Sequence, residues 1–155
     1  MVSPGALEVR KGRATLATVG LGSCVCIGLH DPIAGVGGLT HCLLPEPPGP
    51  TQGPPGRYTS TAVPLLIEKM AAFGARVERM RAWLAGGASM FPDLAPDGLA
   101  GIGARNIAAA RLVLSELGIE LDGEATGGSR GRSVRLEVES GQFVVRSVLQ
   151  PEVVL

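Results

Sequence analysis

The chain has 155 residues, 45% hydrophobic but only 3% aromatic, so we expect one domain, residues 1–155, with an aliphatic core. Fourteen basic and fourteen acidic residues give a formal net charge of zero, which argues against a nucleic-acid partner held by phosphate contacts. No apolar stretch reaches the roughly 18 residues of a membrane span, and no signal-peptide pattern opens the chain, so we expect a cytoplasmic protein without membrane insertion.

The first third of the sequence predicts four short strands around a glycine-rich loop. They occupy residues 6–10, 14–19, 25–29 and 36–44. The last two strands form a hairpin around a turn at residues 31–35. Because residues near the two open ends of a hairpin lie opposite one another, Cys24 and His41 are expected to be neighbours. His30, at the closed end, is expected on the surface.

Cys24 has the sequence context of a thiol nucleophile. It follows Gly20-Leu21-Gly22-Ser23, whose glycines can adopt positive φ and leave backbone N–H groups uncovered beside the sulfur, as an oxyanion site requires. A neighbouring imidazole activates a thiol by taking its proton, and His41 is the candidate for this role. Such pairing lowers the pKa of a cysteine from about 8.5 to about 3.5–7.5.

Two other interpretations apply to the same cysteines. Free cysteine is often simply a small buried hydrophobic residue. A zinc site could be drawn from Cys24, Cys26, His41 and Cys42, but the spacings Cys-x-Cys and His-Cys differ from the usual gaps of about two to four residues. Adjacent strand residues also point to opposite faces, so His41 and Cys42 do not readily share a metal. We therefore predict no metal, and the odd, clustered cysteines fit a reducing compartment.

The next segment predicts a loop and a helix. The Pro- and Gly-rich residues 45–57 either connect two elements or line the substrate entrance. Residues 59–73 form a helix with Pro64 in its first turn. Candidate N-caps are Thr59, Ser60 and Thr61, and the apolar stripe contains Val63, Leu66, Ile67, Met70 and Phe73.

A strand and a second helix follow. The strand at residues 77–85 leads into Gly86-Gly87-Ala88-Ser89-Met90, which lacks a phosphate-binding motif and is interpreted as a tight packing corner near the active site. Residues 92–101 form a loop. A helix runs from residue 102 to about residue 117, and its opening Gly101-x-Gly103 lacks the last glycine of a dinucleotide fingerprint.

The last third predicts strands at residues 119–125, 134–138 and 143–149. Arg130 and Arg132 precede the second of these, where they either carry solvated turn charge or help to hold the loops around the active site. Strands before and after two amphipathic helices, with hairpins at both ends, indicate the α+β class. The expected architecture is a layered sandwich of mixed or antiparallel sheets with two main helices.

Five short segments carry a family resemblance. They are T-V-G-L-G-S-C-V with G-L-T-H-C-L-L-P, then R-Y-T-S-T-A-V, A-G-G-A-S-M-F, I-G-A-R-N and T-G-G-S-R-G-R-S-V. In this order and register they resemble the CheD family, the chemoreceptor glutamine deamidases of bacterial and archaeal chemotaxis. The resemblance covers nearly the whole chain, and it implies a cysteine-hydrolase core shared with the cytotoxic necrotizing factor toxins.

The resemblance implies deamidation of protein glutamine to glutamate without a cofactor. Cys24, His41 and Thr18 match the family's three catalytic positions. His41 takes the Cys24 proton, the thiolate attacks the carboxamide, and the backbone N–H of Cys24, with Gly22 and Ser23 as loop support, holds the oxyanion. Thr18 orients the imidazole.

The same resemblance implies partners. The substrates are glutamines of methyl-accepting chemotaxis receptors, a CheC-type phosphatase is a regulatory partner where one is encoded, and the chain itself is expected to be a monomer. An alternative is a regulatory binding module that stimulates CheC with weak or no deamidase activity. A cysteine protease or a transglutaminase would use the same thiolate, and only the family resemblance separates them.

Overall fold

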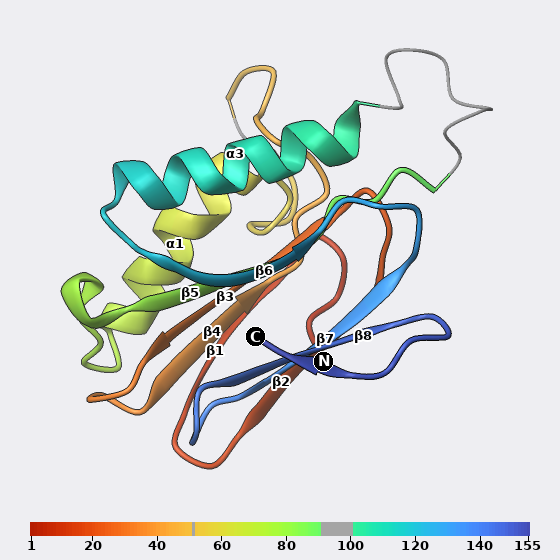
Figure 1. The fold of residues 1–155 in the computed structure, drawn as a ribbon. Helices are drawn as coiled ribbons and strands as arrows, with labels where there is room; N and C mark the ends of the chain where they lie inside the picture. Colours follow the sequence, from red (N-terminus) through yellow and green to blue (C-terminus); the bar gives the residue numbers. More distant parts are fainter. Residues whose placement is uncertain (51, 91–100) are drawn as a thin grey trace.

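The computed structural model describes residues 1–50, 52–90 and 101–155 and has three layers (Figure 1). The middle layer is a sheet of β1 (Leu7–Lys11), β4 (Val36–Thr40), β3 (Val25–Asp31), β5 (Arg81–Gly86) and β6 (Leu121–Thr126), in this spatial order. The second sheet has the order β2 (Thr15–Leu21), β7 (Arg132–Glu137), β8 (Gln142–Ser147) and β9 (Val153–Val154). Helices α1 (Thr59–Ala71) and α3 (Ile102–Glu116) cover the other face of the middle sheet. The predicted α+β layered sandwich is confirmed.

The described strands pair antiparallel except β5 and β6. These two run parallel because α3 carries the chain back between them. The predicted hairpin of β3 and β4 is confirmed, with Gly28 opposite Leu39. β4 ends at Thr40 and not at residue 44. The Ala6 N–H, which would continue the ladder with His41, bonds to the Ser3 carbonyl instead, and Cys42 forms only an isolated bridge with Val25.

Two hydrophobic cores lie on the two faces of the middle sheet. Alternation along β3 sends Ile27 toward the helices and Cys26 toward the second sheet. The helix-side core is aliphatic, as the composition predicts, and includes Val63, Leu66, Met70, Ile107, Val113 and Leu114. The expected burial of Phe73 is wrong, since its side chain is 46% exposed just beyond the end of α1.

The core between the sheets contains an aromatic pair. Trp83 of β5 and Phe143 of β8 stack with ring centroids 5.8 Å apart and an interplanar angle of 9°. Gly28 makes room for Phe143, because a Cβ at this position would lie 2.5 Å from the Phe143 ring. Burial of one such side chain contributes about 1.5–3 kcal/mol, so this contact helps to hold the second sheet on the middle one.

Helix α1 begins without a side-chain cap, contrary to the expectation for Thr59, Ser60 or Thr61. Its N-cap is Tyr58, and no side-chain capping bond is present there. The first N–H groups of the helix have backbone partners instead. The Thr59 N–H donates to the Leu44 carbonyl, and the Ser60 N–H donates to the Pro45 carbonyl. The N-terminus of α1 is therefore capped by the segment that follows His41.

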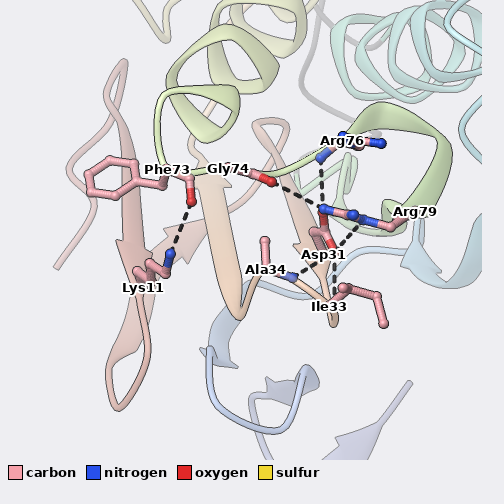
Figure 2. A network of polar contacts seen from close by, with 8 residues as sticks. All are labelled: Lys11, Asp31, Ile33, Ala34, Phe73, Gly74, Arg76 and Arg79. Carbon is pink, nitrogen blue, oxygen red and sulfur yellow. Dashed lines mark hydrogen bonds and ion pairs between the residues drawn. The ribbon is translucent and has the colours of Figure 1, made fainter.

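The predicted strand at residues 77–85 is only partly confirmed. Its first residues form a short 3-10 turn, η1 (Val77–Arg79), and the strand proper is β5. The turn is imposed by Asp31, a buried carboxylate at the end of β3 (Figure 2). Asp31 accepts hydrogen bonds from the Arg79 guanidinium and from the Arg76 N–H, at 2.7 to 3.2 Å.

His30 is buried and not on the surface, which corrects the sequence expectation. It is 3% exposed, and its Nε2 donates to the Val138 carbonyl at 2.9 Å. The turn at Gly141 of the second sheet packs against its ring. The sheet-on-sheet packing that buries His30 joins residues more than 100 positions apart, which the local pattern of a hairpin turn does not reveal.

The second helix and the last strands lie close to their predicted positions. The helix expected from residue 102 is α3, and Gly118 closes it with a φ of +68°. Arg132 is the first residue of β7 and not part of the loop before it. Residue 51 of the Pro-rich loop and the expected loop at 92–100 lie outside the described residues.

Candidate active site

The loop before Cys24 is held by the corner that follows β5. The Ala88 N–H donates to the Gly22 carbonyl, and the Gly87 N–H donates to the Cys24 carbonyl, both at 2.8 Å. A Cβ at Gly86 would collide with the Cys24 carbonyl, so only glycine permits this approach. The prediction that residues 86–90 form a tight packing corner is confirmed, and that corner lies directly against Cys24.

Gly22 and Ser23 complete this loop. A Cβ at Gly22 would lie 2.7 Å from the Met90 sulfur, so the absence of a side chain lets the corner close over the loop. The Ser23 carbonyl faces helix α3, where it accepts from Asn106. Both residues therefore fix the backbone that leads into Cys24.

Strand register places Cys24 and His41 on the same face of the middle sheet. Val25 and Cys42 form an antiparallel bridge, so their side chains share one face and those of Cys24 and His41 share the other. In this register Cys24 and His41 are diagonal neighbours, a relationship that spans about 7–8 Å between Cα atoms. Cys24 is partly buried and packs on the core between the sheets, which is the side on which His41 meets Thr18.

Thr18 and His41 are in hydrogen-bond contact. The Thr18 hydroxyl oxygen lies 2.7 Å from His41 Nδ1 and 2.8 Å from the Val2 carbonyl, and both side chains are buried. A hydroxyl has one proton, and the Val2 carbonyl can only accept, so that proton goes to Val2. The Thr18 oxygen then accepts from Nδ1–H of His41. This tautomer leaves Nε2 with a free lone pair, as a general base requires.

The N-terminal segment also fixes the backbone of His41. The Gly5 N–H donates to the His41 carbonyl at 2.8 Å, and the His41 N–H donates to the Ala6 carbonyl at 3.0 Å. With the side chain tied to Thr18, three hydrogen bonds position this residue. The imidazole is therefore held in one orientation before any substrate binds.

The resting protonation states differ from the sequence expectation. Burial raises the pKa of the Cys24 thiol, and its own backbone N–H offsets this only in part. Burial also lowers the pKa of His41. The expected lowering of the Cys24 pKa is therefore wrong for the resting protein. A neutral thiol and a neutral imidazole are the states that burial favours, because each charged form is desolvated.

Asn106 is a site residue that the sequence analysis missed. It lies in the second turn of α3, fully buried, and its Nδ2 donates to the Ser23 carbonyl at 2.9 Å and to the Leu43 carbonyl at 3.1 Å. The sequence contains a signal for it, since an amide on the apolar stripe with Ile107 and Ala110 needs a polar partner. The expectation assigned these residues only to a helix start.

Comparisons with known proteins agree with this architecture. The family model for CheD, described as CheD chemotactic sensory transduction, matches residues 43–147. A protein of Thermotoga maritima named chemoreceptor glutamine deamidase CheD is 43% identical over 148 residues, which covers 96% of this chain and 91% of that protein. The chain belongs to the CheD family. Two further relatives are named probable chemoreceptor glutamine deamidases: one of Geobacter metallireducens, 44% identical over 93% of this chain and 90% of the relative, and one of Pyrococcus abyssi, 41% identical over 99% and 94%.

The other two cysteines of this CheD chain are buried on opposite faces of the middle sheet. Cys26 lies in the core between the sheets and Cys42 in the helix-side core. Burial raises the pKa of both thiols, that of Cys42 to about 11. The zinc alternative fails on geometry, because Cys42 points away from the face that carries Cys24 and His41. Among the described residues, no group of three or more His, Cys, Asp and Glu side chains is placed to hold a metal.

Arg130 and Arg132 of the CheD chain each donate to a loop carbonyl. Arg132 donates to the Gly127 carbonyl at 2.8 Å, and Arg130 donates to the Val148 carbonyl at 3.3 Å. Of the two sequence interpretations, the structure favours loop support for Arg132, whereas Arg130 is an exposed charge. Arg132 and Gly20 line an open depression of about 630 Å³ next to the loop that precedes Cys24. No helix in the described part of the chain is long and apolar enough to cross a bilayer.

Proposed function

We propose that this chain deamidates glutamine side chains of chemotaxis receptors to glutamate, with Cys24 as nucleophile and His41 as general base. Family membership and the names of the relatives support the substrate class. The observation that carries the mechanism is the chain of contacts from the Val2 carbonyl through Thr18 to His41 Nδ1, because it directs the basic nitrogen of His41 away from Thr18.

The reaction begins with transfer of the Cys24 thiol proton to His41 Nε2. The sulfur attacks the carboxamide carbon, and the oxyanion that forms accepts a hydrogen bond from the Cys24 backbone N–H. His41 then gives its proton to the departing nitrogen, which leaves as ammonia. Water, deprotonated by His41, hydrolyses the thioester, which releases the glutamate side chain and restores the thiol. The net change is carboxamide plus water to carboxylic acid plus ammonia.

The resting state supports proton transfer during attack rather than a preformed ion pair. The pKa of Cys24 is raised and that of His41 is lowered, both by burial, so the proton stays on sulfur until the substrate arrives. His41 is in the neutral form that can accept it. Charge is then separated in the transition state and not in the resting protein. The hydrogen bond donated to the oxyanion offsets part of the free energy that this separation costs in a buried site.

The substrate is a glutamine on a folded receptor helix and not free glutamine. Free glutamine carries an ammonium and a carboxylate group, which would need a buried anion and cation to bind them. Arg132 near the nucleophile loop already donates to a backbone carbonyl. Binding energy for a receptor glutamine comes instead from contacts over the helix surface, which position its carboxamide against Cys24.

The proposal also covers the domain, the oligomeric state and the cellular compartment of the enzyme. Residues 1–155 act as one catalytic unit, as a monomer, in the reducing cytoplasm, where the three unpaired cysteines persist. The placement of nucleophile and imidazole on one sheet face supports the cysteine-hydrolase core implied by the resemblance to the cytotoxic necrotizing factor toxins. Stimulation of a CheC-type phosphatase is a separable binding role, because it needs no thiol, and a Cys24→Ala variant would retain it.

The test compares substrates and variants in parallel. Ammonia release and conversion of amide to acid by peptide mass spectrometry are followed with free glutamine, an unstructured glutamine peptide and a receptor cytoplasmic fragment. Only the fragment should turn over efficiently, and Cys24→Ala and His41→Ala should each lose a factor of about 10³–10⁶ in rate. Full activity of Cys24→Ala overturns the mechanism, and equal rates on all three substrates overturn helix docking. Backbone cleavage or amine incorporation would instead indicate a protease or a transglutaminase.

A further inference from the structure

Asn106 joins the two segments that carry the proposed nucleophile and base. Its Nδ2 group donates to the carbonyl of Ser23, the residue before Cys24, and to the carbonyl of Leu43, two residues after His41. The side chain is fully buried, so water does not compete for these bonds. One amide therefore sets the spacing between the nucleophile loop and the strand end beside it.

The bond to Ser23 determines the direction of the Cys24 N–H. Every described peptide bond is trans, and in a trans peptide the carbonyl of one residue and the N–H of the next point in opposite directions. Because the Ser23 carbonyl points at Asn106 in α3, the Cys24 N–H points away from the helix. That N–H interacts with the Cys24 sulfur, and no backbone carbonyl of the described residues accepts it. It therefore lies on the side of the sulfur, where it can donate to the oxyanion that develops on the carboxamide oxygen as the sulfur attacks.

The peptide after Cys24 is fixed by a second contact. The Cys24 carbonyl accepts from the Gly87 N–H, and Gly87 is itself packed against the first turn of α3 at Gly103. Both peptide units that flank Cys24 are therefore positioned by α3, one through Asn106 and the other through Gly87. Asn106 holds the one that bears the oxyanion donor.

We propose that Asn106 is a positioning residue that aims the Cys24 backbone N–H at the oxyanion of the reaction. The inference rests on the proposed deamidase function and adds a residue to it. Asn106 acts through the Ser23 carbonyl and does not touch the substrate. Its effect belongs to the step in which negative charge develops on oxygen, because that is when the aim of the N–H matters.

Asn106 makes its hydrogen bonds to the described residues through Nδ2 alone, since its buried Oδ1 has no partner among them. Both bonds go to backbone carbonyls. One of these carbonyls belongs to the peptide that carries the Cys24 N–H, so the side chain defines the orientation of that peptide.

The test separates attack on a carbonyl from attack on a saturated carbon. Alkylation of Cys24 by iodoacetamide forms no oxyanion, whereas deamidation does. Asn106→Ala and the near-isosteric Asn106→Asp, which lacks the amide donor, are assayed for kcat and KM on a receptor fragment and for the rate of Cys24 alkylation. We expect kcat to fall by about 10²–10³, as for loss of an oxyanion donor, with KM and the alkylation rate little changed. Asn106→Gln, which keeps the donor, should recover part of kcat.

A matched control distinguishes an effect on the orientation of the Cys24 N–H from a general loss of protein stability. Val113→Ala removes a buried side chain from the same helix without touching Ser23 or Leu43, and it should lower thermal stability while leaving kcat unchanged. If Asn106→Ala and Asn106→Asp lose alkylation and deamidation in parallel, or retain full kcat, the inference is wrong. An active Cys24→Ala variant would instead reject the underlying function, so the two failures are distinguishable.

Discussion

The Thr18 hydroxyl of β2 lies 2.7 Å from Nδ1 of His41, so one buried hydrogen bond connects the second sheet to the segment that follows β4. The same hydroxyl donates to the Val2 carbonyl at 2.8 Å, which leaves only its lone pairs for His41. The tautomer of His41 therefore depends on the packing of two sheets and of the N-terminal segment. Residues distant in sequence determine the direction of the basic nitrogen.

Replacement of Thr18 by valine should slow deamidation without abolishing it. Valine keeps the shape but leaves His41 Nδ1 without its acceptor, which frees the other tautomer. Loss of one buried hydrogen-bond partner costs about 1–3 kcal/mol, so we expect kcat to fall about 10- to 100-fold. Thr18→Ser should retain most activity, and Thr15→Val, an exposed position of the same strand, serves as control. Equal loss in the serine and valine variants would contradict the tautomer argument.

Cys24 should be the first thiol to react with limiting iodoacetamide near neutral pH. It is partly exposed, whereas Cys26 and Cys42 are fully buried and have raised pKa values. Because burial also raises the pKa of Cys24, its alkylation should be slow for an active-site thiol and should accelerate with rising pH. Peptide mass spectrometry of the labelled protein measures the order, and His41→Ala tests how much of the reactivity depends on the imidazole. Simultaneous labelling of all three thiols in the folded protein would refute the assignment.

The pH dependence of kcat/KM should show an acid limb below the ordinary imidazole pKa of about 6.5. Burial lowers the pKa of His41, and the active form is the neutral one, so activity should rise as pH increases through that lowered value and then stay level. The raised pKa of Cys24 keeps the thiol protonated over the same range. Ammonia release between about pH 5 and 8.5 at constant ionic strength gives the profile. A preformed thiolate–imidazolium pair would instead lose activity on the alkaline side as the imidazolium deprotonates.

Asp31 should make stability sensitive to acid. Burial alone would raise its pKa, but hydrogen bonds from Arg79 and from the backbone N–H groups of Arg76, Ala34 and Ile33 lower it to about 2 (Figure 2). A carboxyl with a pKa of about 3.9 in the unfolded chain then contributes about 2–3 kcal/mol above pH 4, and this contribution disappears as pH falls toward 2. Urea unfolding from pH 7 to pH 3 measures the loss.

The variant Asp31→Asn checks the same network at neutral pH. All its partners are donors, so the amide nitrogen of asparagine would face N–H groups, and we expect a loss of about 3 kcal/mol. Arg13→Gln, which breaks only the exposed contact with Glu139, should change stability by less than about 1 kcal/mol. Equal stability of Asp31→Asn and the parent protein would show that the network contributes nothing.

The sequence alone determined the elements whose signals are local. Three- and four-residue apolar spacing predicted both helices, and a turn between two apolar runs predicted the hairpin of β3 and β4. The glycine-rich approach to Cys24, and His41 at the same open end of that hairpin, were enough to propose the nucleophile and its base. These features depend on residues that are close in the chain, so they can be predicted without knowledge of the packing.

Only the tertiary structure decided the properties that arise from long-range burial. His30 has the local pattern of a surface turn, yet the second sheet covers it. Cys24 has the motif of an activated thiol, yet desolvation raises its pKa, because neighbours from several elements exclude water. Asn106 lies 82 residues beyond Cys24 in the sequence, and the role that we propose for it follows from its hydrogen bond to the Ser23 carbonyl. Desolvation and hydrogen-bond partners are set by which elements meet, and that information is not contained in any single stretch of the chain.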